Sequence, residues 1–196
     1  MTTEGIFRRI VEILESVAIP YMLTGSFASS LHGAPRTTQD IDFVIAPTHD
    51  QVRALVRLLP KTEYYVDEAA ALDAATREGM FNVIDLATGW KVDFIIRKSR
   101  PFSVEEFSRR VSTDFMGLNV AVASAEDVVL AKLEWAKAGE SQRQLDDVVG
   151  ILRTRMNGLD LVHIRRWVVD LDLEDLWTRC AAAAGIHEDS PTDGRR

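Results

Sequence analysis

Two aspartates, Asp40 and Asp42, stand two residues apart at the start of the strand-like segment 41–45. Side chains at positions i and i+2 of a strand point to the same face, so both carboxylates project together. Like charges gathered at one spot repel each other unless a cation lies between them. Mg²⁺ prefers oxygen ligands and usually shares its coordination with substrate phosphates. The pair therefore predicts a site for Mg²⁺, or for Mn²⁺ in its place.

A third acid, Asp93, lies within the apolar segment 91–96. A carboxylate in such a strand is costly to bury unless it is paired or binds a metal. We expect Asp93 to complete a cluster of three metal ligands with the first two acids, and to be a possible base. The alternative is an ion pair with Lys91 or Arg97, two or four residues away on the same face of the strand.

A glycine and a serine, Gly25 and Ser26, follow the short apolar segment 21–23 and precede a helical one. Because glycine has no Cβ, its backbone can come close to a phosphate, and the N–H groups at a helix start favour an anion. The Ser26 hydroxyl can also hydrogen-bond a phosphate oxygen. These two residues predict a site for the phosphates of a nucleoside triphosphate (NTP).

The order and spacing of these residues resemble the signature of the nucleotidyltransferase (DNA polymerase β-like) superfamily. That signature is seen here as Gly25-Ser26, then thirteen residues, then Asp40-Ile41-Asp42 in a hydrophobic strand. Segment 36–42 is similar to the bacterial and archaeal branch that includes AbiEii and MenT-type toxins, and Lys91-Val92-Asp93 matches the second motif of that branch. The resemblance covers roughly residues 20–150. It implies a small mixed β-sheet flanked by helices, with a helical C-terminal part closing over the nucleotide.

Further site residues follow from the later motifs of that branch. The family's lysine would be Lys132, contacting nucleotide phosphate or base, and its late acid would be Asp147 or Asp146. A lysine that extends along an apolar helix, and a helical ion pair between Arg143 and Asp147, are the alternatives. Arg36 is expected either to reach a phosphate or to hold its own loop by hydrogen bonds.

The apolar spacing predicts strands mixed with helices up to about residue 122, and helices alone after it. Ser141 with Gln144 matches a capping box, and Asp160 could cap a later helix. The predicted strands are 21–23, 41–45, 81–86, 91–96 and 118–122. The predicted helices are 4–17, 27–31, 50–59, part of 61–79, 103–110, 124–138, one from Ser141, one from Asp160, and 173–184.

This pattern is that of an α+β fold in three parts. Residues 1–122 would form a nucleotidyltransferase core, 123–186 a helical region packed on that core, and 187–196 a disordered tail rich in charge.

The composition limits the partners and the location. A net charge of −7 argues against broad, sequence-independent binding of DNA or long RNA, which depends on Lys and Arg. No run of about 18 apolar residues occurs, so no membrane is expected as a partner. The lone cysteine, Cys180, allows no internal disulfide, and the N-terminus lacks a secretory pattern. These features favour the cytoplasm.

The main hypothesis is an enzyme that transfers a nucleoside monophosphate from an NTP to a hydroxyl, with Asp40, Asp42 and Asp93 at its centre. The resemblance implies an acceptor that varies widely, such as a tRNA end, a protein hydroxyl or a small molecule. The alternative is a module that binds an NTP without turnover, such as an antitoxin or regulatory partner. A toxin paired with an antitoxin is a third reading, which concerns biological role.

Overall fold

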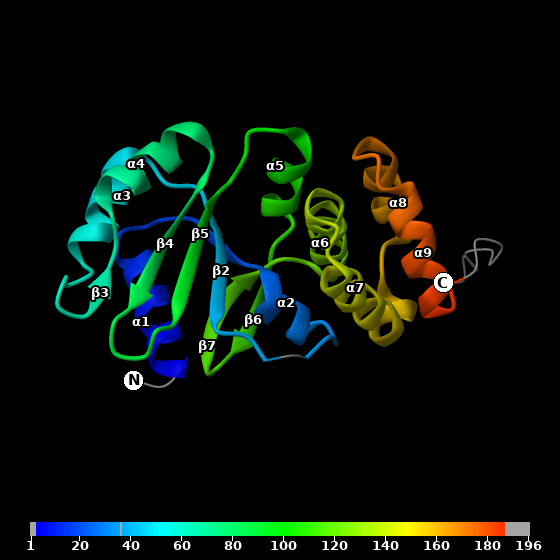
Figure 1. Cartoon of the computed structure of the whole chain (residues 1–196), viewed down its shortest axis with the longest axis horizontal. Coiled ribbons are helices and arrows are strands. Elements are labelled where there is room, and N and C mark those ends of the chain that lie inside the picture. The colour runs from blue at the N-terminus through cyan, green and yellow to red at the C-terminus, as the bar shows by residue number, and fades with distance from the viewer. Residues whose placement is uncertain (1–2, 36, 187–196) are drawn as a thin grey trace. The chain divides into compact units, whose positions relative to one another are not determined.

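The computed structural model describes residues 3–35 and 37–186. It divides into two compact units, one of Met1–Ala28 with Arg36–Ser124 and one of Ser29–Pro35 with Ala125–Arg196. The first unit is built around a β-sheet and the second from helices (Figure 1). The predicted disordered tail, 187–196, and Arg36 lie outside the described residues.

Across the described part of the chain, seven strands form one mixed sheet in the order β3-β4-β5-β2-β1-β7-β6. The pairs β2–β5 and β1–β7 are parallel, whereas the other neighbouring pairs are antiparallel. The strands are β1 (Tyr21–Leu23), β2 (Asp40–Ile45), β3 (Tyr64–Tyr65), β4 (Met80–Asp85), β5 (Lys91–Ile96), β6 (Val111–Phe115) and β7 (Leu118–Val122).

The centre of the sheet has one apolar and one polar face, because side chains alternate along each strand. Phe43 of β2 stacks on Phe94 of β5 with ring centroids 6.1 Å apart. Phe43 also stacks on Phe7 of helix α1 (Thr3–Ser16) at 5.9 Å, so α1 covers this apolar face. Asp40 and Asp42 alternate with the apolar positions of β2 and therefore project from the opposite face.

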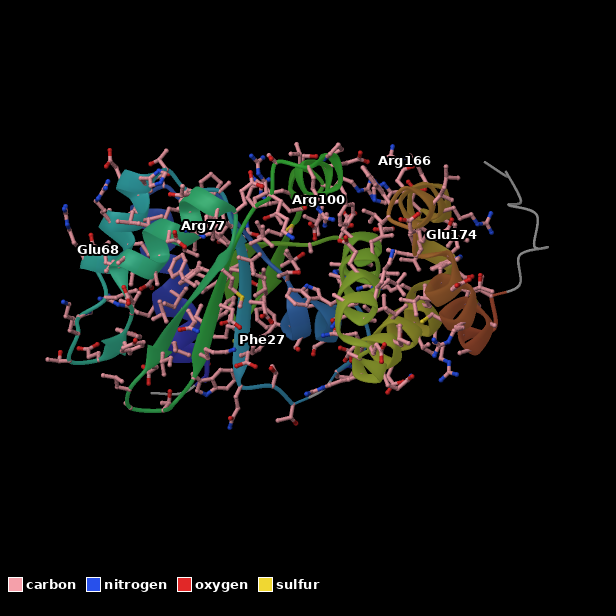
Figure 2. The ribbon with its side chains drawn as sticks, turned by 45° about the horizontal axis from the view of Figure 1, so that its top comes forward. Phe27, Glu68, Arg77, Arg100, Arg166 and Glu174 are labelled. Atoms are coloured by element: carbon pink, nitrogen blue, oxygen red, sulfur yellow. The ribbon has the colours of Figure 1, made fainter. Side chains whose placement is uncertain are left out.

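The remaining helices of the first unit follow the strands along the chain. They are α3 (His49–Arg57), α4 (Glu68–Arg77), α5 (Pro101–Ser108) and the start of α2 (Gly25–Leu31), which continues into the second unit. Thr48 forms a capping box with Gln51 at the start of α3, and the Gln51 amide donates to the Ala18 carbonyl at the end of α1. The hydrogen bond from Gln51 to Ala18 ties α3 to α1 within the unit. Figure 2 shows Glu68 and Arg77 at the two ends of α4.

The second unit is a group of helices in which α7 packs against both α6 and α9, and α8 against α6. Its elements are α6 (Ala125–Gly139), α7 (Gln142–Arg155), the 3₁₀ turn η1 (Met156–Gly158), α8 (Leu161–Asp170) and α9 (Glu174–Ala184). Segment 29–35 belongs to this unit, since the Thr154 hydroxyl donates to the Gly33 carbonyl at 3.3 Å. Of the helices in residues 3–35 and 37–186, none is both long and apolar enough to cross a bilayer.

The structure adds two strands that the sequence pattern does not predict. β3 has two residues, too few for a periodic signal, and β6 lacks a buried face because most of its side chains are exposed. β6 and β7 are joined by Met116-Gly117, and both turn residues have positive φ, at 52° and 70°. A two-residue hairpin turn requires such angles. The glycine at 117 was the one signal for this hairpin.

The helix-start predictions had mixed outcomes. The capping box at Ser141 is wrong, because the Ser141 side chain makes no capping bond and Gln144 accepts a hydrogen bond from Lys132 instead. The cap at Asp160 is confirmed, since its carboxylate accepts from the backbone N–H of His163 at 2.9 Å. The buried ammonium of Lys132 thus binds the Gln144 side chain, which a capping box would have paired with the backbone N–H of Ser141.

Stability should decline at alkaline pH because of Tyr21. This side chain is almost fully buried on β1 and donates to Glu15 at 3.1 Å. Burial, with the charge of Glu15, raises the pKa of Tyr21 to about 12. An unfolded chain releases that proton at about pH 10, so above that pH the unfolded state binds fewer protons than the folded state. The free energy of unfolding should therefore fall as the pH rises from about 10 to 12.

Urea unfolding at a series of pH values measures this decline. Tyr21→Phe should reduce it, whereas Tyr65→Phe, at a side chain that is 56% exposed, should leave it unchanged. An identical decline in Tyr21→Phe and in the unmodified protein would show that Tyr21 is not responsible.

Candidate active site

The parallel pairing of β2 with β5 sets the acids of the site side by side. Asp42 lies directly opposite Asp93 in the register, and Asp40 lies opposite Lys91. Partners in register point to the same face, so these four side chains share the polar face of the sheet. On the next strand, β4, the register places Asn82 opposite Asp93. The three predicted acids therefore come together on one face of two adjacent strands, β2 and β5.

Lys91 bridges two of the predicted metal ligands. Its Nζ lies 2.9 Å from Oδ2 of Asp93 and 3.6 Å from Oδ1 of Asp40. The hydrogen bond to Asp93 raises the pKa of Lys91, and the negative charges of Asp93 and Asp40 act in the same direction. The ion pair that the sequence left open as the alternative for Asp93 is thus formed, with Lys91 as the partner.

The second oxygen of Asp93 has no partner among the residues that the structure describes. Oδ1 is buried and accepts no hydrogen bond, and Asp93 as a whole is 6% exposed. Buried polar atoms are nearly always satisfied, so an orphaned carboxylate oxygen points to a group that binds there. Beside Asp42, this oxygen fits a hard divalent cation, which takes oxygen ligands.

The three acids do not by themselves enclose an ion in the described residues. No group of three or more His, Cys, Asp or Glu side chains there is arranged to hold a metal. The ammonium of Lys91 lies between Asp40 and Asp93, where it neutralises part of the charge that a metal would neutralise. A metal site at Asp40, Asp42 and Asp93 therefore stays a prediction.

Gly25 brings the predicted phosphate turn against the acid pair. Its φ is +61°, and a Cβ built on it would lie 2.0 Å from Oδ2 of Asp42. The backbone N–H of Thr24 donates to the Asp42 carbonyl at 2.9 Å, which fixes the turn to β2. Only glycine permits this approach, because it lacks a Cβ and tolerates the left-handed conformation. Gly25 begins α2, and Ser26, the next residue in its first turn, is 5% exposed.

An aromatic pair lies next to this turn. Phe27, labelled in Figure 2, follows Ser26 on α2 and is 9% exposed. Its ring lies 6.2 Å from that of Trp90, which immediately precedes β5 and Lys91. Phe27 also makes an edge contact with Phe115 of β6 at 5.7 Å. Both the glycine turn and the start of β5 are therefore anchored to the aromatic packing of the first unit.

The predicted nucleotide-binding lysine, Lys132, belongs to the second unit and is 4% exposed. Its Nζ donates to Oδ2 of Asp147 at 2.7 Å and to Oε1 of Gln144 at 2.8 Å. Asp146, the other candidate for the late acid, instead accepts a hydrogen bond from Gln142 at 2.9 Å. This buried ion pair joins α6 to α7. A contact between Lys132 and a nucleotide stays a prediction.

Two residues on the polar face of the sheet, Lys91 and Asn82, were not assigned a functional role from sequence. Lys91 was considered merely as a partner for Asp93, and Asn82 was not considered at all. The sequence signal for Asn82 was the predicted turn Ala87-Thr88-Gly89, which lies between β4 and β5. The length of the connection between these strands sets which residue of β4 faces Asp93. The Asp85 carboxylate fixes this turn by accepting from the N–H and the hydroxyl of Thr88.

Comparisons with known proteins identify the fold. A nucleotidyltransferase-like protein from Paracoccidioides brasiliensis is 14% identical, with a TM-score of 0.58 and 92% of each chain covered. The antibiotic-resistance factor ANT(2'')-Ia is 13% identical, with a TM-score of 0.54, covering 95% of this chain and 97% of that one. The lincosamide antibiotic adenylyltransferase LnuA, solved with lincomycin bound, is 11% identical, with a TM-score of 0.52 and coverage of 77% and 96%.

No protein-family model matches the chain, and no curated protein matches it either. The likeness to solved structures nevertheless confirms the predicted nucleotidyltransferase fold, a mixed sheet flanked by helices. At these identities the likeness concerns the fold.

Gly25→Ala should cost more stability than a glycine substitution with the same backbone strain. Gly89 provides the matched control, because its φ is +75° and an added Cβ would meet nothing within 4 Å. Gly89→Ala should cost about 1–2 kcal/mol, the price of a left-handed alanine. Gly25→Ala should cost about 1–3 kcal/mol beyond that, because the Asp42 carboxylate must also move. Urea unfolding of both variants measures the difference, and equal losses would contradict the close approach.

Lys132→Met should destabilise the protein strongly, because it leaves the Asp147 carboxylate buried without its cation. Removing one partner of a buried ion pair costs about 3–5 kcal/mol, whereas an apolar pair of similar volume is often tolerated. The double variant Lys132→Met/Asp147→Leu should therefore recover most of the loss in urea unfolding. Lys137→Met, on the same helix with its side chain 49% exposed, is the control and should change stability by less than about 1 kcal/mol. A small loss for Lys132→Met would argue against a structural role for the pair.

Proposed function

We propose that this chain, which has the nucleotidyltransferase fold, transfers a nucleoside monophosphate from an NTP to a hydroxyl acceptor and releases pyrophosphate. The proposal rests above all on Asp93. Its carboxylate is buried opposite Asp42, and one of its oxygens has no partner within residues 3–35 and 37–186. A purely structural acid would be satisfied by its surroundings. The fold supports the proposal because the solved proteins that share it include a nucleotidyltransferase-like protein and an adenylyltransferase by name.

Asp42 and Asp93 would hold Mg²⁺ or Mn²⁺, with Asp40 as a further ligand. A bound divalent ion would supply Lewis-acid stabilisation of the charge on the triphosphate and lower the pKa of the acceptor hydroxyl. The backbone at Gly25 and the Ser26 hydroxyl would hold the β- and γ-phosphates. Because the turn is fixed to β2 beside Asp42, it would orient the triphosphate against the acids without a further change of the strand.

The transfer breaks one bond and forms another at the α-phosphorus. The acceptor oxygen attacks that atom, the bond to the oxygen bridging the α- and β-phosphates breaks, and pyrophosphate leaves with the electron pair. The acceptor proton must be removed, and the Asp93 carboxylate would be the base that accepts it. Arg36 and Lys132 would assist by contacting phosphate.

The acceptor would be an RNA end such as that of tRNA, a protein hydroxyl or a small molecule. Two of the structural neighbours are a lincosamide antibiotic adenylyltransferase and the antibiotic-resistance factor ANT(2'')-Ia, which was also solved with adenylyl-2''-tobramycin, so lincomycin and tobramycin are reasonable members of a test panel. A cytoplasmic location and a role in a toxin–antitoxin pair are further parts of the proposal. Growth arrest on expression, relieved by Asp42→Asn, would support the toxin role.

The contacts of Lys91 favour a second candidate function, a module that binds an NTP without turnover. In the described residues the acids do not form a ready metal cluster, and a protein ammonium partly neutralises them. Such a module would bind NTPs saturably and release no pyrophosphate. The enzyme reading is preferred because all three acids are present on one face and Asp93 Oδ1 lacks a partner.

Asp42→Asn should abolish transfer. With Mg²⁺ or Mn²⁺, α-³²P-labelled NTPs and a panel of RNA, protein and small-molecule acceptors, the unmodified protein should label at least one acceptor and release pyrophosphate. Asp42→Asn should lower the rate by at least about a hundredfold, because the amide replaces a charged metal ligand. Scintillation counting of separated products, with a coupled pyrophosphate assay, gives both measurements.

Asp114→Asn is the matched control, since Asp114 is an exposed acid on strand β6. It should retain full activity. Saturable NTP binding with no labelling and no pyrophosphate would favour the second candidate, and equal labelling by Asp42→Asn would exclude the proposed site.

A further inference from the structure

Lys91 holds the same carboxylate that the proposed metal needs. Its Nζ is 2.9 Å from one oxygen of Asp93, and the other oxygen of that group has no partner in the described part of the chain. Its second contact, at 3.6 Å, is to Asp40, the outer acid of the pair on β2. We propose that Lys91 is a positioning residue that makes the acid site accept a divalent ion well only together with a nucleotide. This inference rests on the proposed function.

The first step is competition for charge. An ammonium at hydrogen-bond distance from Asp93 supplies a positive charge at the place where a divalent ion would supply two. Two cations that share one pair of carboxylates repel each other, so each weakens the binding of the other. A free metal ion must therefore either bind beside Lys91 against this repulsion or displace it from Asp93. In both cases the lysine lowers the affinity for metal alone.

The second step is what a triphosphate changes. It brings about four negative charges and many acceptor oxygens to the same face of the sheet. Lys91 can leave Asp93 for such an oxygen, because a lysine has a flexible four-carbon stem and this side chain is 37% exposed. When the Lys91 ammonium binds a phosphate, the negative charge of that phosphate offsets the repulsion between the lysine and the metal. Metal and nucleotide should therefore bind with positive coupling.

The third step is reciprocity. If a nucleotide raises the affinity for the metal, the metal must raise the affinity for the nucleotide by the same factor. Lys91 would contribute to this factor in two ways, by weakening the metal site in the absence of nucleotide and by binding phosphate in its presence. The site would then bind metal weakly when no nucleotide is present. The acids would be neutralised by Lys91 in the nucleotide-free state and by the metal in the nucleotide-bound state.

A merely structural lysine makes the opposite prediction. If Lys91 serves only to hold Asp93 and Asp40 in place, its removal should let the acids move apart and should weaken metal binding in every state. If Lys91 is a competing cation, its removal should strengthen binding of metal alone. The direction of change in nucleotide-free metal affinity therefore separates the two roles without any measurement of activity.

The experiment titrates Mn²⁺ into the full chain and follows free Mn²⁺ by electron paramagnetic resonance, with and without the α,β-methylene analogues of the four NTPs. Lys91→Met should bind Mn²⁺ alone at least about tenfold more tightly than the unmodified protein, and its gain in affinity on adding the analogue should be smaller by a similar factor. Lys91→Gln, which keeps a hydrogen-bond donor for Asp93 without the charge, should behave in the same way and covers the case in which the methionine variant fails to fold.

Two matched variants complete the design. Lys98→Met removes an exposed lysine just beyond the end of β5 and should leave both affinities unchanged. Lys91→Arg keeps the charge and should keep the weak binding of metal alone. Nucleotide-free Mn²⁺ affinity that is equal or weaker in Lys91→Met and Lys91→Gln overturns the inference while leaving the metal site intact. If the unmodified protein with nucleotide binds no Mn²⁺ that Asp42→Asn loses, the proposed function fails and this inference fails with it.

Discussion

The site depends on one electrostatic constraint, the placement of two carboxylates opposite each other on adjacent parallel strands. Asp42 and Asp93 are partners in the register of β2 and β5, and Asp93 is buried. Like charges at such spacing, with one of them shielded from water, are unfavourable unless a cation is present. The structure supplies one cation from its own chain, Lys91, and leaves one oxygen of Asp93 unsatisfied. The remaining features of the site can be understood as ways of keeping this unfavourable pair in place.

The apolar face of the sheet provides the force that keeps the register. Phe43 and Phe94 are direct neighbours in the same ladder that pairs the acids, and both are fully buried. Phe81 of β4 extends the row, with its ring 5.1 Å from that of Phe94. A slip of one residue would turn these rings to the polar face and the acids into the core, so the register is strongly determined. The packing of α1 against this face thus stabilises the position of charges on the other face.

The sequence predicted what depends on local pattern. A few residues of sequence are enough to recognise each of three features: the i, i+2 spacing of Asp40 and Asp42, the apolar strand around Asp93, and the glycine before Ser26. The helical second half was predicted for the same reason, whereas the mixed sheet was implied by the resemblance to the nucleotidyltransferase superfamily. β3 and β6 were missed because neither combines length with a buried face, and β6 is specified by the turn at Gly117 and by its partner strand.

What the sequence could not supply is the competition among partners that are distant along the chain. Gln144 fits a capping box by spacing, but Lys132 lies within 2.8 Å of it and takes its side-chain oxygen. Lys132 fits a phosphate ligand by motif, but in the second unit it is also the counter-ion of Asp147. The contact of Lys91 with Asp40 likewise follows from the register of two strands, whereas its pairing with Asp93 was an alternative that the sequence offered. In each case a charge in low dielectric selects the strongest available partner, and that choice is made in three dimensions.

The glycine turn gives the final link between fold and chemistry. Thr24 donates to the main chain of Asp42, and the backbone of Gly25 then lies directly against the carboxylate of the same residue. The turn proposed to hold phosphate follows β1, and the acid proposed to hold metal lies on the adjoining strand β2, so the two are already in contact. A ligand that bridges them needs no rearrangement of turn or strand, so its binding energy would be available to displace Lys91 from Asp93.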